Sequence, residues 1–285
     1  MTKNRYAGAP RNADYTIDQQ WASYSAVEHN RWDRLYARAV DVLQTRACPE
    51  FLAALDQLQL SEAGIPDMAH LSDRLKPLTG WQVVPVTDLV PDEIFFDHLA
   101  NRRFPAGAFI RPEEEMDYLS EPDIFHDIFG HVPLLANPTY ADFMQAYGQG
   151  GHKALARGQL ANLARLYWYT VEFGLVRSAD GLKLFGAGIM SSASESRFAL
   201  ESDAPHRVAF DLERVMRTDY IIDDFQQTYF VIDSFQDLLD RCYGDFSGLY
   251  DRLTAQPDIA PDQVVPGDEV LHRGSLDYFR AKAAE

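Results

Sequence analysis

Two histidines share the segment Glu121-Pro-Asp-Ile-Phe-His126-Asp-Ile-Phe-Gly-His131-Val-Pro133, which is otherwise mostly apolar and aromatic. Pro122 suits the first turn of a helix, and the spacing predicts that this helix closes between Gly130 and Pro133. Five residues on an ideal α-helix are about 140° apart, so both imidazoles reach one ion only if the helix is distorted between them. Gly130 permits that distortion. An H-x4-H pair alone also fits two partly buried histidines with ordinary hydrogen bonds.

A carboxylate in a second apolar segment strengthens the metal hypothesis. Glu172 stands in Leu166-Tyr-Trp-Tyr-Thr-Val-Glu172-Phe-Gly174, where a lone buried carboxylate would be costly unless it is paired or bound to a metal. Two imidazoles and one carboxylate form the facial triad of non-haem iron(II) enzymes. The same three ligands, His126, His131 and Glu172, could make a His2Glu zinc site.

Three functional classes stay open on the ligands alone. They are an iron enzyme that uses O2, a zinc hydrolase and a metal-binding helical protein without catalysis. The zinc peptidase pattern H-E-x-x-H is absent, because the spacing differs and Asp127 replaces the glutamate base. Oxygen chemistry is therefore favoured over hydrolysis.

Aromatic residues and one arginine surround these segments. Trp168 and Glu172 are four residues apart, so on a helix an aromatic wall and a candidate ligand face the same way. A flat aromatic substrate would suit that wall. Arg111 follows an apolar run, where it forms either a surface ion pair or a bidentate clamp on a carboxylate.

The hydrophobic pattern predicts a mainly helical fold. Apolar residues recur at three- and four-residue spacing from Trp21 to Leu43, a helix that stops before Pro49. Further helices are predicted at residues 50–60, from Pro91 onward, at 159–173 and at 229–253. A short edge strand is predicted at 81–86, and a hairpin at 175–185 around the turn Asp180-Gly181.

No repeat or linker divides the chain. We expect a disordered segment at residues 1–15 and one domain at 16–285, mainly α with a minor β-hairpin and short-strand element. Beyond Pro257 the chain reads as polar and irregular.

Composition excludes several classes of partner. The 285 residues include 43 acidic and 26 basic residues, a formal net charge of −17, which disfavours nucleic acid and anionic membranes. Two cysteines, Cys48 and Cys242, cannot build a disulfide framework, which fits a reducing cytoplasm. No apolar run has the length of a signal peptide or a membrane span. Secretion and membrane insertion are not expected.

Three motifs in one order resemble the catalytic domain of the pterin-dependent aromatic amino acid hydroxylases. They are Tyr118-Leu-Ser-Glu-Pro-Asp-Ile-Phe-His126-Asp-Ile-Phe-Gly-His131-Val-Pro-Leu134, Tyr167-Trp-Tyr-Thr-Val-Glu172-Phe-Gly174 and Phe185-Gly-Ala-Gly-Ile-Met-Ser191-Ser192. The likeness runs from about Thr79 to Phe235 without large gaps. It implies an iron(II)-dependent monooxygenase that uses a tetrahydropterin, such as tetrahydrobiopterin, with O2 as co-substrate.

The resemblance also implies roles for individual positions. Iron would be held at His126, His131 and Glu172. Pterin contacts fall on Leu89, Val90, Asp92, Phe95, Asp127, Ala164 and Tyr167, with Phe95 as the stacking ring. Substrate contacts fall on Arg111, Leu119, Ser120, His126, Trp168, Phe173, Gly188 and Ser191, with Arg111 as the carboxylate clamp. No catalytic residue is expected outside the iron shell.

Two departures from the animal members concern single contacts. Leu119-Ser120 replaces a Thr-Pro pair, and Pro105 stands where those proteins carry a pterin-contacting histidine. The animal members also have a regulatory domain and a tetramerisation helix, for which this sequence has no room. A monomer without cooperativity is expected.

The substrate expected from the resemblance is L-phenylalanine, converted to L-tyrosine. The segment Asp219-Tyr-Ile-Ile-Asp-Asp-Phe-Gln226 aligns with a family loop beside the substrate, where tyrosine-using members carry an aspartate. Ile221 and Ile222 stand at or next to that position, and an apolar wall favours phenylalanine over tyrosine only moderately. Tyrosine or tryptophan hydroxylation remains the alternative.

Overall fold

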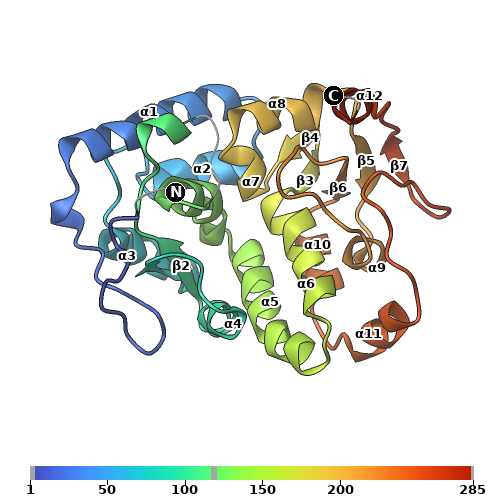
Figure 1. The fold of residues 1–285 in the computed structure, drawn as a ribbon, viewed down its shortest axis with the longest axis horizontal. Helices are drawn as coiled ribbons and strands as arrows, with labels where there is room; N and C mark the ends of the chain where they lie inside the picture. Colours follow the sequence, from blue (N-terminus) through green and yellow to red (C-terminus); the bar gives the residue numbers. More distant parts are fainter. Residues whose placement is uncertain (1–3, 117–120, 284–285) are drawn as a thin grey trace. The chain divides into compact units, whose positions relative to one another are not determined.

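The computed structural model describes residues 4–116 and 121–283, which form two compact units. The first unit comprises Met1–Gln44 and Pro49–His152, and the second comprises Thr45–Cys48 and Lys153–Glu285. Helices dominate both units (Figure 1), so the predicted mainly α fold class is confirmed. The single domain at 16–285 stays a prediction. Among the described residues, no helix is both long enough and apolar enough to cross a bilayer.

The first unit packs helices around a pair of parallel strands. Its elements are η1 Trp21–Ser23, α1 Ala26–Leu43, α2 Pro49–Gln57, α3 Met68–Thr79, β1 Gln82–Val86, α4 Asp92–Ala100, β2 Arg103–Gly107, η2 Glu113–Glu115, η3 Phe125–His131, η4 Pro133–Ala136 and most of α5 Pro138–Ala156. Strands β1 and β2 pair in register from Gln82 with Arg103 to Val86 with Gly107. Helix α3 packs on β1 and α4 packs on β2 (Figure 1). The predicted short strand is confirmed.

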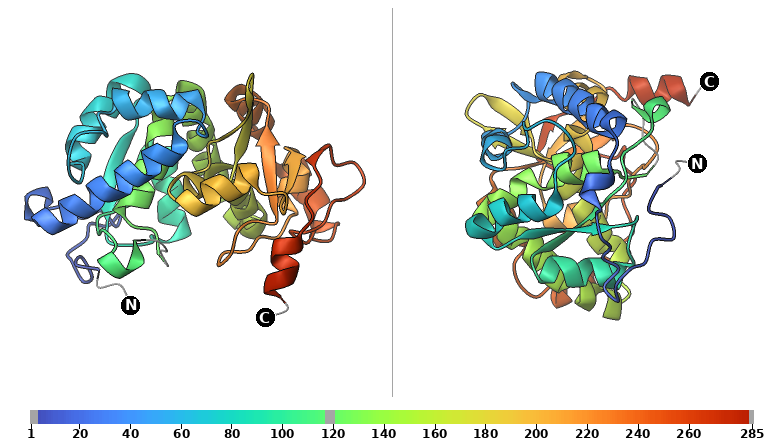
Figure 2. Two further views of the ribbon diagram at one scale, coloured as in Figure 1. Left: turned by 90° about the horizontal axis from the view of Figure 1, so that it is seen from above. Right: turned by 90° about the vertical axis from the view of Figure 1, so that its left-hand side faces the viewer.

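The second unit is built on a five-stranded sheet. Its elements are α6 Leu160–Tyr167, η5 Trp168–Glu172, β3 Leu175–Ser178, β4 Gly181–Leu184, α7 Ala187–Met190, α8 Ala193–Glu201, β5 His206–Ala209, α9 Leu212–Met216, β6 Thr228–Ile232, α10 Phe235–Cys242, α11 Ser247–Thr254, β7 Val270–His272 and α12 Asp277–Lys282. The strand order is β4-β3-β6-β5-β7, and the strands are coloured yellow to red in Figure 2. The predicted hairpin is confirmed as β3 and β4, with Gly181 at a φ of 117° in the turn.

The long helix predicted at 229–253 is wrong. Residues Thr228–Ile232 form β6, a central strand that pairs in parallel with both β3 and β5 and is buried along its whole length. Ser234 then caps α10 by accepting a hydrogen bond from Asp237 N, and Gly244, at a φ of 129°, separates α10 from α11. The apolar run is a buried strand followed by two short helices.

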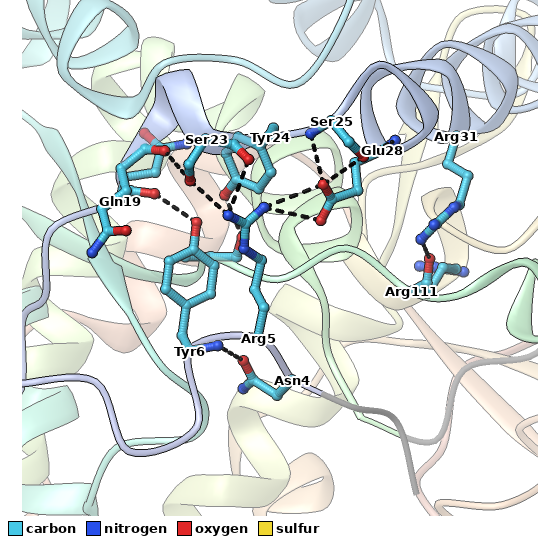
Figure 3. Close-up of polar contacts among 12 residues, drawn as sticks. Asn4, Arg5, Tyr6, Gln19, Ser23, Tyr24, Ser25, Glu28, Arg31 and Arg111 are labelled. Atoms are coloured by element: carbon cyan, nitrogen blue, oxygen red, sulfur yellow. Dashed lines mark hydrogen bonds and ion pairs between the residues drawn. The ribbon is translucent and has the colours of Figure 1, made fainter.

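Two described stretches near the ends of the chain, residues 4–15 and those after Pro257, make defined contacts or form regular elements. Beyond Pro257, which reads as irregular, the chain forms β7 and α12. Arg5 and Tyr6, within the residues 1–15 for which the sequence predicts disorder, contact Glu28 at the start of α1 and Gln19 before it (Figure 3). Tyr6 is 4% exposed and its hydroxyl donates to the carbonyl of Gln19 at 2.6 Å, while Arg5 pairs with Glu28 at 3.1 Å. The composition of a segment does not reveal single polar contacts of this kind to residues further along the chain.

Candidate metal centre

Both histidines lie on a π-helix of the first unit, η3. Hydrogen bonds of the π type join residues five apart, so they place the side chains of His126 and His131 on the same side. The two Nε2 atoms are 3.2 Å apart, and the rings meet edge to face at 5.0 Å between centroids. The distortion predicted at Gly130 therefore extends over the whole segment.

Aromatic packing holds this π-helix. Phe125 and Phe129 stack at 4.8 Å between ring centroids. Trp32 of α1 packs edge-on against Phe125 at 5.3 Å, and Phe51 of α2 packs against Phe129 at 5.5 Å. All four side chains are buried, so the rotation of η3 and the direction of its histidines are fixed by the core.

Arg111, the predicted carboxylate clamp, is buried and is itself paired with a carboxylate of the protein, Asp123. Its Nε and Nη2 donate to the two oxygens of Asp123, each at 2.8 Å, and its backbone N donates to the same carboxylate at 2.9 Å. Burial alone would raise the pKa of Asp123, but the charge and hydrogen bonds of Arg111 hold it below its ordinary value. The pair leaves Nη1 of Arg111 unused by Asp123. Arg31 Nη1 donates to the carbonyl of Arg111 at 2.8 Å (Figure 3).

The structure places the first-unit pterin candidates on and before α4 and on η3. Leu89 and Val90 lie in the loop after β1, with Leu89 78% exposed, while Asp92 and Phe95 lie on α4. Asp127 Oδ2 accepts a hydrogen bond from Gly107 N at 2.7 Å. Gly107 pairs with Val86, the last residue of β1, so Asp127 is tied to the strand end from which the loop departs.

The remaining candidates lie in the second unit or outside the described residues. Ala164 and Tyr167 lie three residues apart on α6, both half-buried, and Ser191 follows α7. Leu119 and Ser120 lie outside the described residues.

Glu172 is the last residue of a second π-helix, η5. Two glycines, Gly186 before α7 and Gly188 within it, allow α7 and the residue before it to lie against Glu172. A Cβ at Gly186 would be 2.3 Å from the carbonyl oxygen of Glu172, and a Cβ at Gly188 would be 3.2 Å from Glu172 Oε2. A side chain at Gly186 would therefore collide with the main chain, and one at Gly188 would require a small shift of its neighbours. Gly188, predicted to contact the substrate, thus lies beside the candidate ligand.

Trp168, at the start of η5, lies in an aromatic cluster. Its ring stacks on Tyr220 at 4.3 Å with an interplanar angle of 16° and lies 4.7 Å from the ring of Phe173. Its Nε1 donates to Gln226 Oε1 at 2.9 Å. The predicted wall of Trp168 and Phe173 is therefore present within the second unit.

Four residues around these candidates were not singled out from the sequence as site residues. Asp123, Gly186, Tyr220 and Gln226 hold Arg111, Glu172 or Trp168. Asp123 was visible as a carboxylate near the histidines, but nothing in the sequence pairs it with Arg111. The sequence does not mark Gln226 as a site residue, because a single glutamine is usually found on the protein surface.

The histidine pair fits a metal ion in its chemistry and spacing. Two imidazole nitrogens about 2.1 Å from one ion are about 3.0 Å apart at a right angle and about 3.4 Å apart at a tetrahedral angle. The separation of 3.2 Å between His126 Nε2 and His131 Nε2 lies between these values. The pair alone does not distinguish iron from zinc.

Comparison with known proteins identifies a family and several relatives of this chain. The family described as biopterin-dependent aromatic amino acid hydroxylase matches residues 5–252. A phenylalanine-4-hydroxylase from Caulobacter vibrioides is 59% identical over 276 residues, 96% of this chain and 94% of that protein. One from Ralstonia nicotianae is 54% identical over 270 residues, 95% of this chain and 86% of that protein.

A solved structure is similar over nearly the whole chain. The crystal structure of phenylalanine hydroxylase from Chromobacterium violaceum bound to cobalt has a TM-score of 0.93 and 49% sequence identity. The match covers 95% of this chain and 98% of that one.

Proposed function

Because this chain belongs to the biopterin-dependent aromatic amino acid hydroxylases, we infer that it is a monooxygenase that acts on phenylalanine. It hydroxylates L-phenylalanine to L-tyrosine with O2, and it uses iron and a tetrahydropterin. The observation that carries this conclusion is the 59% identity to a phenylalanine-4-hydroxylase over 96% of the chain. A zinc hydrolase or a non-catalytic metal protein has no comparable support.

His126, His131 and Glu172 are the proposed iron ligands. Two imidazoles and one carboxylate are the donor set of mononuclear iron(II) oxygenases. The facing Nε2 atoms of the histidines support the proposal within the first unit. Gly188 supports it within the second, because a Cβ at this position would be 3.2 Å from Glu172 Oε2 and would crowd the carboxylate.

The pterin candidates would hold the reduced cofactor. When bound, iron(II) and the tetrahydropterin supply O2 activation and two electrons, and one oxygen atom enters the aromatic ring. We assign the pterin to Leu89, Val90, Asp92, Phe95, Asp127, Ala164 and Tyr167. The half-buried ring of Phe95 offers a stacking face, and the tie of Asp127 to Gly107 fixes that carboxylate.

Substrate binding is assigned to Arg111 and to the aromatic wall. Asp123 orients the guanidinium, so that Nη1 is presented to the substrate carboxylate without reorganisation. Trp168 and Phe173 bound the space for the ring and exclude water from it. Gly188, Ser191, His126, Leu119 and Ser120 complete the proposed contacts.

The preference among aromatic amino acids is tested by kinetics. We expect kcat/KM at fixed O2 and pterin to be higher for phenylalanine than for tyrosine or tryptophan. Ile221 and Ile222 offer no polar partner for a ring hydroxyl, and such pockets discriminate by about a hundredfold. A higher value for tyrosine or tryptophan would support the alternative activity. Metal analysis of His131→Ala should show lost iron together with lost activity, whereas full hydroxylation by this variant would refute the ligand assignment.

We further propose a cytoplasmic monomer without nucleic acid or membrane partners. Cys48 and Cys242 are buried and do not form a disulfide, as expected in a reducing compartment. The net charge of −17 opposes binding to polyanions.

A further inference from the structure

Gln226 is a buried amide whose side-chain atoms all have partners in the second unit. The residue is 1% exposed, and its Oε1 accepts the hydrogen bond from Trp168 Nε1 at 2.9 Å. Its Nε2 donates to the carbonyls of Ile221 and Asp224 at 2.8 and 3.3 Å. Turning the amide over would place a donor against the indole N–H and an acceptor against two carbonyls. These contacts specify one orientation of Gln226.

The main chain of Gln226 is held by a second buried group, Glu195 of α8. Gln226 N donates to Glu195 Oε1 at 3.4 Å, and the Tyr229 hydroxyl donates to the same oxygen at 2.8 Å. Tyr229 lies on the central strand β6 and is fully buried. A buried carboxylate persists only with such donors. Gln226 is thus fixed to α8 and, through Tyr229, to the sheet.

Gln226 connects Trp168 to the segment 219–226, which carries Ile221 and Ile222. Tyr220 of this segment stacks on Trp168, and Tyr169 of η5 donates its hydroxyl to the carbonyl of Asp219 at 2.6 Å. The segment is therefore tied to the π-helix at its start by Tyr169 and near its end by Gln226. A shift of Gln226 would move both the indole and the segment.

We propose that Gln226 is a positioning residue for substrate selection, which holds Trp168 and the segment 219–226 in one register and so sets the width of the space for the substrate ring. The inference rests on the proposed function, in which Trp168 and this segment face the ring. Gln226 acts through Trp168 and does not itself contact the substrate. A merely structural Gln226 would affect stability without changing which amino acid is preferred.

The first test is Gln226→Leu, which keeps the approximate size and removes all three side-chain hydrogen bonds. We expect kcat/KM for phenylalanine to fall about tenfold, mainly through KM, as the loss of one or two buried hydrogen bonds would give. The preference for phenylalanine over tryptophan should narrow, because a looser wall admits the larger ring. KM for tetrahydropterin should not change. The matched control is Gln227→Leu at the next, half-buried position, which should alter none of these quantities.

A double-mutant cycle with Trp168→Phe tests the route of the effect. This substitution removes the N–H that Gln226 accepts, so Gln226→Leu should add little to it. If Gln226→Leu does not fold, Gln226→Met takes its place, because it also removes the acceptor for Trp168 Nε1 and the donor to the carbonyls of Ile221 and Asp224. Additive effects of the two substitutions would overturn the proposal.

Calorimetric binding of phenylalanine to each variant gives a readout apart from turnover, and its dissociation constant should rise with KM. A lower melting temperature with unchanged amino acid preference and unchanged binding would refute the positioning role. If the unsubstituted protein makes no tyrosine from phenylalanine, the proposed function itself fails. If it does, and Gln226→Leu keeps the original preference, only this inference fails.

Discussion

A substitution at Gly188 tests whether Glu172 is a metal ligand. An added Cβ would be 3.2 Å from Glu172 Oε2 and 3.0 Å from Phe173 Cζ. These distances are tighter than ordinary carbon contacts, so the carboxylate or the ring must shift by a few tenths of an ångström. We expect Gly188→Ala to lower iron affinity by about tenfold, because metal ligands tolerate little displacement. Metal titration of the purified protein measures the change.

The matched control for Gly188→Ala is Gly248→Ala. Gly248 lies in α11 of the same unit, and a Cβ there would meet nothing within 4 Å. This change should leave iron affinity unchanged and stabilise the helix slightly, since alanine has the higher helix propensity. Equal iron affinity in both variants would show that the space beside Glu172 is not needed for metal binding.

Glu195 makes the stability of the protein depend on pH. Burial raises the pKa of Glu195 from its ordinary 4.5 to about 7, against the opposing hydrogen bonds from Tyr229 and Gln226. A raised carboxyl pKa means that the folded state holds the proton more tightly. The stability that protonated Glu195 adds to the folded state is therefore fully present below pH 4.5, and it is lost as the pH rises to about 7. The whole shift corresponds to about 3 kcal/mol.

Glu195→Gln should remove this pH dependence. The new amide stays neutral, and its oxygen can still accept from Tyr229. Urea unfolding at pH 5 and pH 8 should show a loss of up to about 3 kcal/mol on raising the pH in the unsubstituted protein, and a smaller loss in the variant. Glu114→Gln, at an exposed position, is the control. The same pH dependence in Glu195→Gln as in the parent protein would contradict this account.

At the scale of elements, the sequence predicts where helices lie better than what kind of helix they are. The spacing of His126 and His131 requires a distortion, and the structure supplies a π-helix. The helix predicted at 159–173 changes from α to π after Tyr167 without any local signal. Hydrophobic periodicity does not register such a change, because the extra residue per turn is accommodated by packing with distant elements.

The sheet was underpredicted for a related reason. The run Tyr229-Phe-Val-Ile232 is apolar on every residue, and such a run fits a buried strand as well as a buried helix. Its partner β3 lies more than 50 residues earlier in the sequence, and its partner β5 carries few apolar residues, so neither marks the run as a strand. Hairpin β3–β4 was predicted because its turn is local.

We expect the segment 4–15 to stabilise the fold through the buried side chain of Tyr6. Tyr6→Phe keeps the buried ring and removes the hydrogen bond to the Gln19 carbonyl, which would then lack that donor. We expect a loss of about 1 kcal/mol in the free energy of unfolding. Tyr15→Phe is the control, since this ring is only half-buried and contacts the guanidinium of Arg11 through its face. Equal stability of both variants would show that the hydrogen bond from Tyr6 to Gln19 does not stabilise the fold.

For the whole molecule, the sequence predicts the candidate ligand residues but not the residues that surround them. The candidate ligands are titratable residues inside apolar segments: His126, His131 and Glu172. This conflict with the surrounding hydrophobicity can be seen in the sequence alone. Asp123, Gly186 and Gln226 act through long-range contacts with Arg111, Glu172 and Trp168, and nothing local marks them. The long-range partners of a site are the part that only the fold reveals.

We expect the protein to stay monomeric when salt screens its surface charge. The large exposed apolar residues among the described ones come from separate elements or loops: Trp21, Val27, Leu78, Leu89, Ile222, Tyr243 and Tyr278. Leu89 and Ile222 lie in segments with proposed cofactor and substrate roles. A net charge of −17 also makes copies repel each other at low salt. At about 1 M salt the screening length falls to about 3 Å, so repulsion no longer hides an apolar interface.

Sedimentation at about 0.1 M and about 1 M salt shows whether charge repulsion or the lack of an apolar interface keeps the copies apart. We expect one species of 32.3 kDa at both concentrations, and a hyperbolic dependence of rate on phenylalanine. A dimer that forms only at high salt would mean that charge alone keeps the copies apart and that an apolar interface exists. A stable tetramer at both concentrations, or a sigmoidal rate curve, would mean that the described surface supports assembly. Either result would contradict the proposed monomer.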